Sequence, residues 1–139
     1  YEIPFGKADI KRPGNKVTII SYSGMVRTCI QASEFLSKNF NFECEVIDLR
    51  TLRPLDFETI IKSVKKTGRA VVVEEAWKTG GFGANISETI QLEAFDYLDS
   101  PVIRIASEDV PAPYNRKLEL DTMPSEQKIV TAIKQNFSI

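Results

Sequence analysis

The segment RAVVVEE, residues 69–75, carries the pattern on which the fold prediction rests. Its centre is a run of valines, without the alternation of polar and apolar residues that a half-exposed strand shows. A strand that is apolar on both faces is typical of a parallel sheet covered by helices. Gly68 directly precedes it and suits the left-handed C-cap of a helix. We therefore expect this strand to follow a helix within a covered sheet.

The same alternation of strand and helix extends in both directions along the chain. Further strands are predicted where short apolar, β-branched runs are bounded by turn residues. These strands are KVTIIS (16–21), ECEVIDL (43–49) and SPVIRIAS (100–107). The long proline-bearing segment 108–124 is predicted to be a loop.

Helices are predicted where apolar residues recur with helical spacing. One runs from Met25 to about Lys38, and a second begins after Asp56, a good N-cap residue. A third is opened by TGGFGANI (79–86), and a last one follows Ser125. This alternation predicts an α/β fold, a three-layer αβα sandwich around a mainly parallel, partly mixed sheet of about five strands.

Length and composition indicate one ordinary globular domain. The chain has 139 residues, 42% apolar and 27% charged, with a net charge of −1. This balance disfavours binding to nucleic acid or to an anionic membrane. No apolar run approaches the roughly 20 residues that span a bilayer. We expect residues 1–15 to be a linker or arm and residues 16–139 to form the domain.

The chain has no histidine, so it lacks the commonest general base near neutral pH and the commonest metal ligand. Its two cysteines, Cys29 and Cys44, both fall in apolar-periodic segments. We interpret them as reduced thiols in the protein interior, as in a reducing compartment.

Charged residues gather where the predicted strands end. Arg50 and Arg53 follow strand 43–49, Glu74 and Glu75 end strand 69–75, and Asp109 follows strand 100–107. The carboxyl ends of parallel strands meet at one edge of a sheet, where function usually lies. Because the arginine guanidinium matches carboxylates, a salt bridge from one of the glutamates to Arg50 or Arg53 is expected here.

The glycine turn GGFG, residues 80–83, raises the alternative of phosphate binding at a helix N-terminus. It matches neither G-x-G-x-x-G nor a P-loop, and the two upstream glutamates would repel phosphate. We favour a tight turn that lets the backbone approach another group closely. Acid–base chemistry by Glu74 and Glu75 is also disfavoured, because adjacent strand residues point to opposite faces.

Three aromatic residues are candidates for a docking surface. Trp77 follows strand 69–75, Phe82 lies in the glycine turn, and Tyr114 ends the rigid segment DVPAPY (109–114). The alternatives are that the proline segment is a plain surface connection and that Trp77 covers the glycine turn. If exposed, these side chains form a patch through which the isolated chain self-associates.

Five motifs, in this order, resemble one family. They are SYSGMV (21–26), DLRTLRPLD (48–56), VVVEEAWKTGGFGANI (71–86), FDYLDSPVIRI (95–105) and DVPAPY (109–114). Together they resemble the C-terminal domain of pyruvate dehydrogenase beta subunits, which are thiamine-diphosphate-dependent 2-oxoacid dehydrogenase components, over Tyr1–Ile139. The wording of EEAWKTGGFG is more similar to the branched-chain type of these enzymes, whereas DVPAPY is more similar to the pyruvate type.

The resemblance implies a role in a larger enzyme. The whole subunit has an N-terminal domain that binds the pyrimidine end of the cofactor and supplies the catalytic histidine. Residues 1–15 would enter from it. On this resemblance, the C-terminal domain would bind neither thiamine diphosphate nor Mg²⁺ directly and would supply no catalytic or metal-binding residue. It would support an alpha2–beta2 heterotetramer, contacting the alpha subunit and a second beta subunit, in bacterial cytoplasm or the mitochondrial matrix.

The resemblance also implies particular contacts. Asp99 and the terminal carboxylate of Ile139 match positions that meet the peripheral subunit-binding domain of the dihydrolipoyl acetyltransferase. The residues expected at domain or subunit interfaces are Arg50, Arg53, Glu74, Glu75, Trp77, Phe82 and Tyr114. Three alternatives remain: a branched-chain enzyme, another transketolase-superfamily enzyme such as deoxyxylulose-phosphate synthase, and a free-standing nucleotide-binding α/β module.

Overall fold

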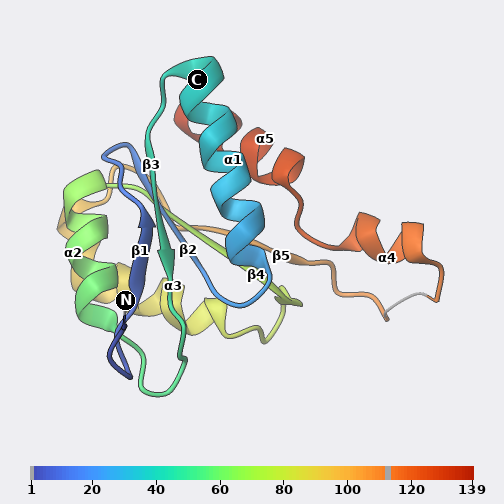
Figure 1. Ribbon diagram of the computed structural model, residues 1–139, viewed down its shortest axis with the longest axis horizontal. Coiled ribbons are helices and arrows are strands. Elements are labelled where there is room, and N and C mark those ends of the chain that lie inside the picture. The colour runs from blue at the N-terminus through green and yellow to red at the C-terminus, as the bar shows by residue number, and fades with distance from the viewer. Residues whose placement is uncertain (1, 112–113) are drawn as a thin grey trace.

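The computed structural model describes residues 2–111 and 114–139. Helices and strands alternate along most of the chain (Figure 1). Their bounds are β1 Asp9–Arg12, β2 Val17–Ser21, α1 Met25–Phe40, β3 Cys44–Asp48, α2 Phe57–Thr67, β4 Ala70–Trp77, α3 Gly83–Ala94, the 3₁₀ turn η1 Phe95–Tyr97, β5 Ile103–Ser107, α4 Arg116–Thr122 and α5 Glu126–Phe137.

The strands form one sheet in the order β1-β3-β2-β4-β5. Strand β1 pairs antiparallel with β3, and the other neighbouring strands pair parallel. The parallel strands therefore end together along one side, here called the carboxyl edge, and begin together along the opposite side, the amino edge. The predicted mainly parallel, partly mixed sheet is confirmed.

Helices cover both faces of this sheet, which confirms the three-layer sandwich. Helices α1 and α5 lie on one face, and α2 and α3 lie on the other (Figure 1). Each face has its own apolar cluster: the first includes Cys29, Leu36 and Ile133, and the second includes Ile60, Ile86 and Ile90. Because valines of β4 belong to both clusters, the strand is buried on both sides, as its sequence predicts.

The predicted helix boundaries rest on local hydrogen bonds that the structure contains. The Asp56 carboxylate accepts from the Thr59 N–H at 3.2 Å and caps α2. Gly68, with a φ of 74°, ends the same helix in the left-handed region. Ser125 Oγ accepts from the Lys128 N–H at 3.1 Å and caps α5. These helix ends could be predicted from the sequence because each depends on residues close together in the chain.

Two elements lie where the sequence predicts none. Strand β1 falls inside the segment 1–15 that we expect to be an arm, and it forms one edge of the sheet. Helix α4 falls inside the predicted loop 108–124, has no buried residue, and projects away from the sandwich in Figure 1. Both are short and mostly exposed, so neither shows the apolar periodicity on which prediction depends.

Both cysteines are free and buried, as predicted. Burial raises the pKa of each thiol to about 12, so both stay protonated at neutral pH. No helix of residues 2–111 and 114–139 combines the length and apolar character needed to cross a membrane.

Candidate functional site

Glu74 is the most deeply buried acidic residue near the carboxyl edge, with 1% of its surface exposed. Its Oε1 accepts from the Tyr22 hydroxyl at 2.9 Å. Its Oε2 accepts from the Gly83 N–H at 2.8 Å and from Arg104 Nη2 at 3.2 Å. One carboxylate thus joins β4, β5, the end of β2 and the start of α3.

The Glu74 carboxylate explains the glycine turn. Phe82 is the N-cap of α3 and offers no side-chain hydrogen bond, so Glu74 supplies the acceptor and the negative charge from across the turn. A Cβ at Gly83 would overlap Glu74 Oε2, and one at Gly81 would lie 2.5 Å from the Trp77 carbonyl oxygen. The turn is glycine-rich because backbone and carboxylate approach closely, which is the interpretation favoured from sequence.

The expected salt bridge between the glutamates and Arg50 or Arg53 is wrong. The ion pair that Glu74 makes is with Arg104. Arg50 instead donates from its N–H to Asp48 Oδ1 at 2.9 Å and from Nη1 to the Ile3 carbonyl at 3.4 Å. Strand β2 separates β3 from β4, and two strand spacings put about 10 Å between the strands carrying the two groups.

The burial of Glu74 leaves it poorly placed for the contact with another domain or subunit that the sequence suggests. A side chain that is 1% exposed and holds three donors of its own chain has little surface to offer a neighbour. Glu75, the next residue, is exposed, as the opposite faces of a strand require. Burial and the Glu74 carboxylate together raise the pKa of the Tyr22 hydroxyl, which keeps its proton in the hydrogen bond.

The other interface candidates differ in exposure. Arg50 and Arg53 are exposed at the carboxyl edge, Trp77 is 53% exposed, and Tyr114 is fully exposed on the excursion after β5. Phe82 is only half-buried and packs against the apolar cluster under α2 and α3. The structure therefore leaves four of these side chains open to a neighbour and uses Phe82 partly inside the domain.

Asp109 ties two loops of this edge together. Its carboxylate accepts from the Thr79 N–H at 2.9 Å and from the Thr79 hydroxyl. These hydrogen bonds lower the pKa of Asp109 below its ordinary value. The turn that follows Trp77 is thereby fixed to the segment after β5.

Asp99 and Ile139, the two expected partner contacts, both lie at the amino edge. The Asp99 N–H donates to the Gly68 carbonyl at 2.8 Å, just before β4 begins. The next residue, Arg69, places its guanidinium 4.9 Å from the ring centre of Phe137, two residues before Ile139. The Gly68–Arg69 pair thus contacts both the loop of Asp99 and the end of α5.

Sequence reasoning missed Tyr22 and Arg104. Arg104 interrupts the apolar run of strand 100–107, and a charge in such a run signals a buried partner. Within the described residues, no group of three or more acidic, cysteine or histidine side chains is placed to hold a metal ion.

The fold is that of a known domain class. A family model described as "Transketolase, C-terminal domain" matches residues 6–129. The chain belongs to this family. Among solved structures, a split-gene transketolase described as an inactive beta4 tetramer superposes with a TM-score of 0.82 at 23% identity, over 99% of this chain and 43% of that one. A 2-oxoglutarate:ferredoxin oxidoreductase from Magnetococcus marinus superposes with a TM-score of 0.61 at 13% identity, over 94% and 19%. These two structures bear on the fold alone.

Within this domain family, the chain is highly similar in sequence to proteins of one kind. The pyruvate dehydrogenase E1 component subunit beta of Rickettsia conorii is 50% identical over 133 residues, 96% of this chain and 40% of that protein. The mitochondrial subunit of the same name from Bos taurus is 46% identical over 140 residues, all of this chain and 39% of that protein. The resemblance stated from the motifs is confirmed. The chain spans about two fifths of the length of these relatives.

Proposed function

We propose that this chain is the assembly and docking domain of a pyruvate dehydrogenase (acetyl-transferring) beta subunit. Identity of 50% over nearly the whole chain to subunits of that name supports pyruvate over branched-chain substrates. The parent enzyme would be an alpha2–beta2 heterotetramer that decarboxylates pyruvate and reductively acetylates lipoyl groups. Relatives from a bacterium and from mitochondria support a bacterial cytoplasm or the mitochondrial matrix as its location.

In this proposal the cofactor lies outside the domain. Thiamine diphosphate with Mg²⁺ would supply the carbanion chemistry in the parent enzyme. The Gly83 amide is the group at the start of α3 that a diphosphate would use, and the Glu74 carboxylate already accepts from it. A diphosphate there would face a buried carboxylate, so these residues do not fit it. The isolated chain would accordingly be inactive.

The amino edge is the proposed docking side. Asp99 and Ile139 would meet side chains of the acetyltransferase's peripheral subunit-binding domain. The observation that carries this proposal is the Gly68–Arg69 pair, which holds the loop of Asp99 and the end of α5 at one edge. Two contacts on one edge can act together on one partner, with Asp99 attracting its basic side chains.

The carboxyl edge is the proposed assembly side. Arg50, Arg53, Glu75 and Trp77 are exposed there, and Tyr114 is exposed beyond it. Exposed tryptophan, tyrosine and arginine are the residue types enriched at protein interfaces. The alpha subunit and the second beta subunit are the proposed occupants of this side. The isolated chain would self-associate through the same residues.

The test is binding of the assembled tetramer to the peripheral subunit-binding domain at low and high salt. Asp99→Asn should weaken binding by about tenfold or more at low salt, because it removes one charge from the contact. It should also flatten the dependence on salt. Asp121→Asn, a change at an exposed aspartate on α4, is the control and should bind as the parent does. Unchanged affinity and salt dependence in Asp99→Asn would refute this docking role.

A further inference from the structure

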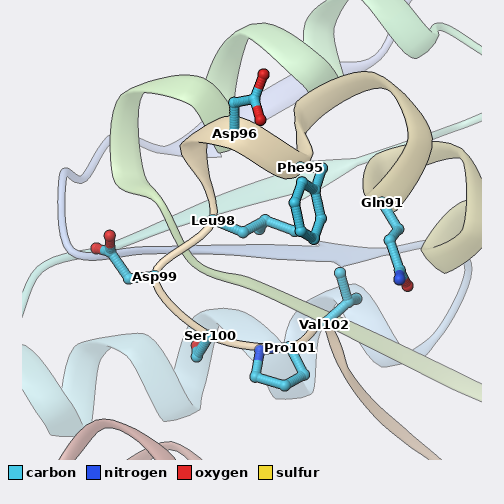
Figure 2. A pocket seen from close by; sticks show the side chains of 8 residues that line it. All are labelled: Gln91, Phe95, Asp96, Leu98, Asp99, Ser100, Pro101 and Val102. Carbon is cyan, nitrogen blue, oxygen red and sulfur yellow. The ribbon is translucent and has the colours of Figure 1, made fainter.

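A hollow of about 520 Å³ opens beside Asp99, between the end of α3 and the start of β5. Figure 2 shows the side chains of Phe95, Leu98 and Val102 converging on it, with the Gln91 amide reaching toward it from α3. Leu98 and Val102 continue into the apolar cluster under α2 and α3, so the floor of the hollow is fixed by the core. Phe95 is 65% exposed, so most of its ring is available to a partner.

The rim of this hollow is polar and acidic. In Figure 2 the carboxylates of Asp96 and Asp99 point outward from its edge, away from the apolar interior. Lys65 is a nearby cation, but its Nζ lies over the ring of Tyr97, 5.1 Å from the ring centre, and neither residue lines the hollow. Two carboxylates thus border an apolar interior.

We propose that this hollow is an anchor pocket for an apolar side chain of a basic partner segment, with lysine or arginine flanking that side chain. The charge of the rim selects the flanking residues, and the phenylalanine, leucine and valine walls select the anchor. An apolar centre within a charged rim is the usual anatomy of a specific protein contact. The inference rests on the proposed function, because it places the anchor beside Asp99 on the same docking side.

The acidic rim and the apolar pocket should contribute to binding in ways that respond differently to salt. Removing a rim charge acts on electrostatic attraction, which salt screens. Removing a pocket wall acts on apolar burial, which salt screens far less. A variant of the pocket should therefore weaken binding by a similar factor at low and at high salt, unlike Asp99→Asn.

The experiment measures the affinity of the assembled tetramer for the peripheral subunit-binding domain, with the beta subunit carrying Phe95→Ala. We expect about a tenfold loss at both salt concentrations, since truncating an anchor wall typically costs that much. Phe95→Leu should recover most of the affinity. Leu92→Ala is the matched control, because Leu92 is 75% exposed on α3, three residues before Phe95, and does not line the hollow. It should bind as the parent does.

A second variant tests the pocket without removing a side chain that packs on the domain, so that weaker binding cannot be due to unfolding. Gln91→Trp, at an exposed helix position, fills the hollow from outside and should weaken binding without lowering the melting temperature. If Phe95→Ala and Gln91→Trp both bind as the parent does while Asp99→Asn binds weakly, the pocket inference is wrong and the docking proposal stands. If Asp99→Asn also binds normally, the docking proposal itself fails. An equal loss in Leu92→Ala would also contradict the pocket, because a residue outside the hollow would then matter as much as Phe95.

Discussion

At the scale of single residues, Glu74 determines the conformation of the glycine turn. Its carboxylate caps α3 through the Gly83 N–H and pairs with Arg104, whose Nε is buried without a hydrogen-bond partner among the described residues. Removing one member of a buried charged pair leaves the other charge uncompensated. The turn, the helix start and β5 therefore depend on one side chain.

Gly83→Ala should destabilise the domain by about 2–4 kcal/mol, because the new Cβ would overlap Glu74 Oε2 and disrupt a buried hydrogen bond. Chemical denaturation with urea measures this free energy of unfolding. Gly80→Ala is the control: Gly80 has a φ of 77°, and a methyl group added there would meet no atom within 4 Å, so backbone strain alone should cost about 1 kcal/mol. Equal losses in the two variants would mean that contact with Glu74 is unimportant.

At the scale of elements, Asp56 joins the start of α2 to the segment before β1. Its carboxylate accepts from the Thr59 N–H and hydroxyl, and from the Ala8 N–H at 2.9 Å. Burial raises the pKa of Asp56, but these hydrogen bonds outweigh burial and leave the pKa below its ordinary value of 3.8. The ionised carboxylate is therefore the form that stabilises the fold.

This shift predicts how stability depends on pH. A group with a lowered pKa in the folded state contributes stability above its unfolded pKa and loses it as pH falls through the folded pKa. Asp56→Asn keeps a good N-cap but does not titrate. The parent should exceed this variant by about 1 kcal/mol at pH 7, and the difference should shrink below about pH 4. Unfolding measured across pH checks this, and a constant difference would contradict it.

The helices and strands differ in how well the sequence predicts them. The ends of α2 were predictable because Asp56 and Gly68 act on neighbours in the chain. The pairing of Glu74 with Arg104 joins residues 30 positions apart, and no local pattern indicates which arginine a glutamate meets. Strand β1 and helix α4 were missed because few of their side chains are buried. Their sequences therefore lack a regular spacing of apolar residues.

At the scale of the whole molecule, the two edges of the sheet carry the proposed division of roles. The expected partner contacts, Asp99 and Ile139, gather at the amino edge through Gly68 and Arg69. The exposed arginines and Trp77 lie at the carboxyl edge. The sequence suggests both sets of residues as expected contacts, but the placement of Asp99 and Ile139 at one edge follows only from the fold.

In the proposed heterotetramer, Arg50→Ala combined with Arg53→Ala should weaken association of the subunits, because both side chains are exposed on the proposed assembly side. A loss of about tenfold in association is expected if the pair contributes as interface arginines usually do. Sedimentation equilibrium measures it, with steady-state kinetics on pyruvate as the comparison. An intact tetramer with a selectively raised Michaelis constant for pyruvate would instead assign these arginines to the substrate.

Docking at the amino edge and assembly at the carboxyl edge should be separable in the assembled enzyme. Sedimentation velocity of Asp99→Asn tetramer, mixed with labelled peripheral subunit-binding domain, reports assembly and docking in the same sample. We expect the variant to sediment as an intact tetramer while the labelled domain remains free at concentrations where the parent binds it. A dissociated tetramer, or an intact tetramer that still carries the labelled domain, would show that the two edges do not have these separate roles.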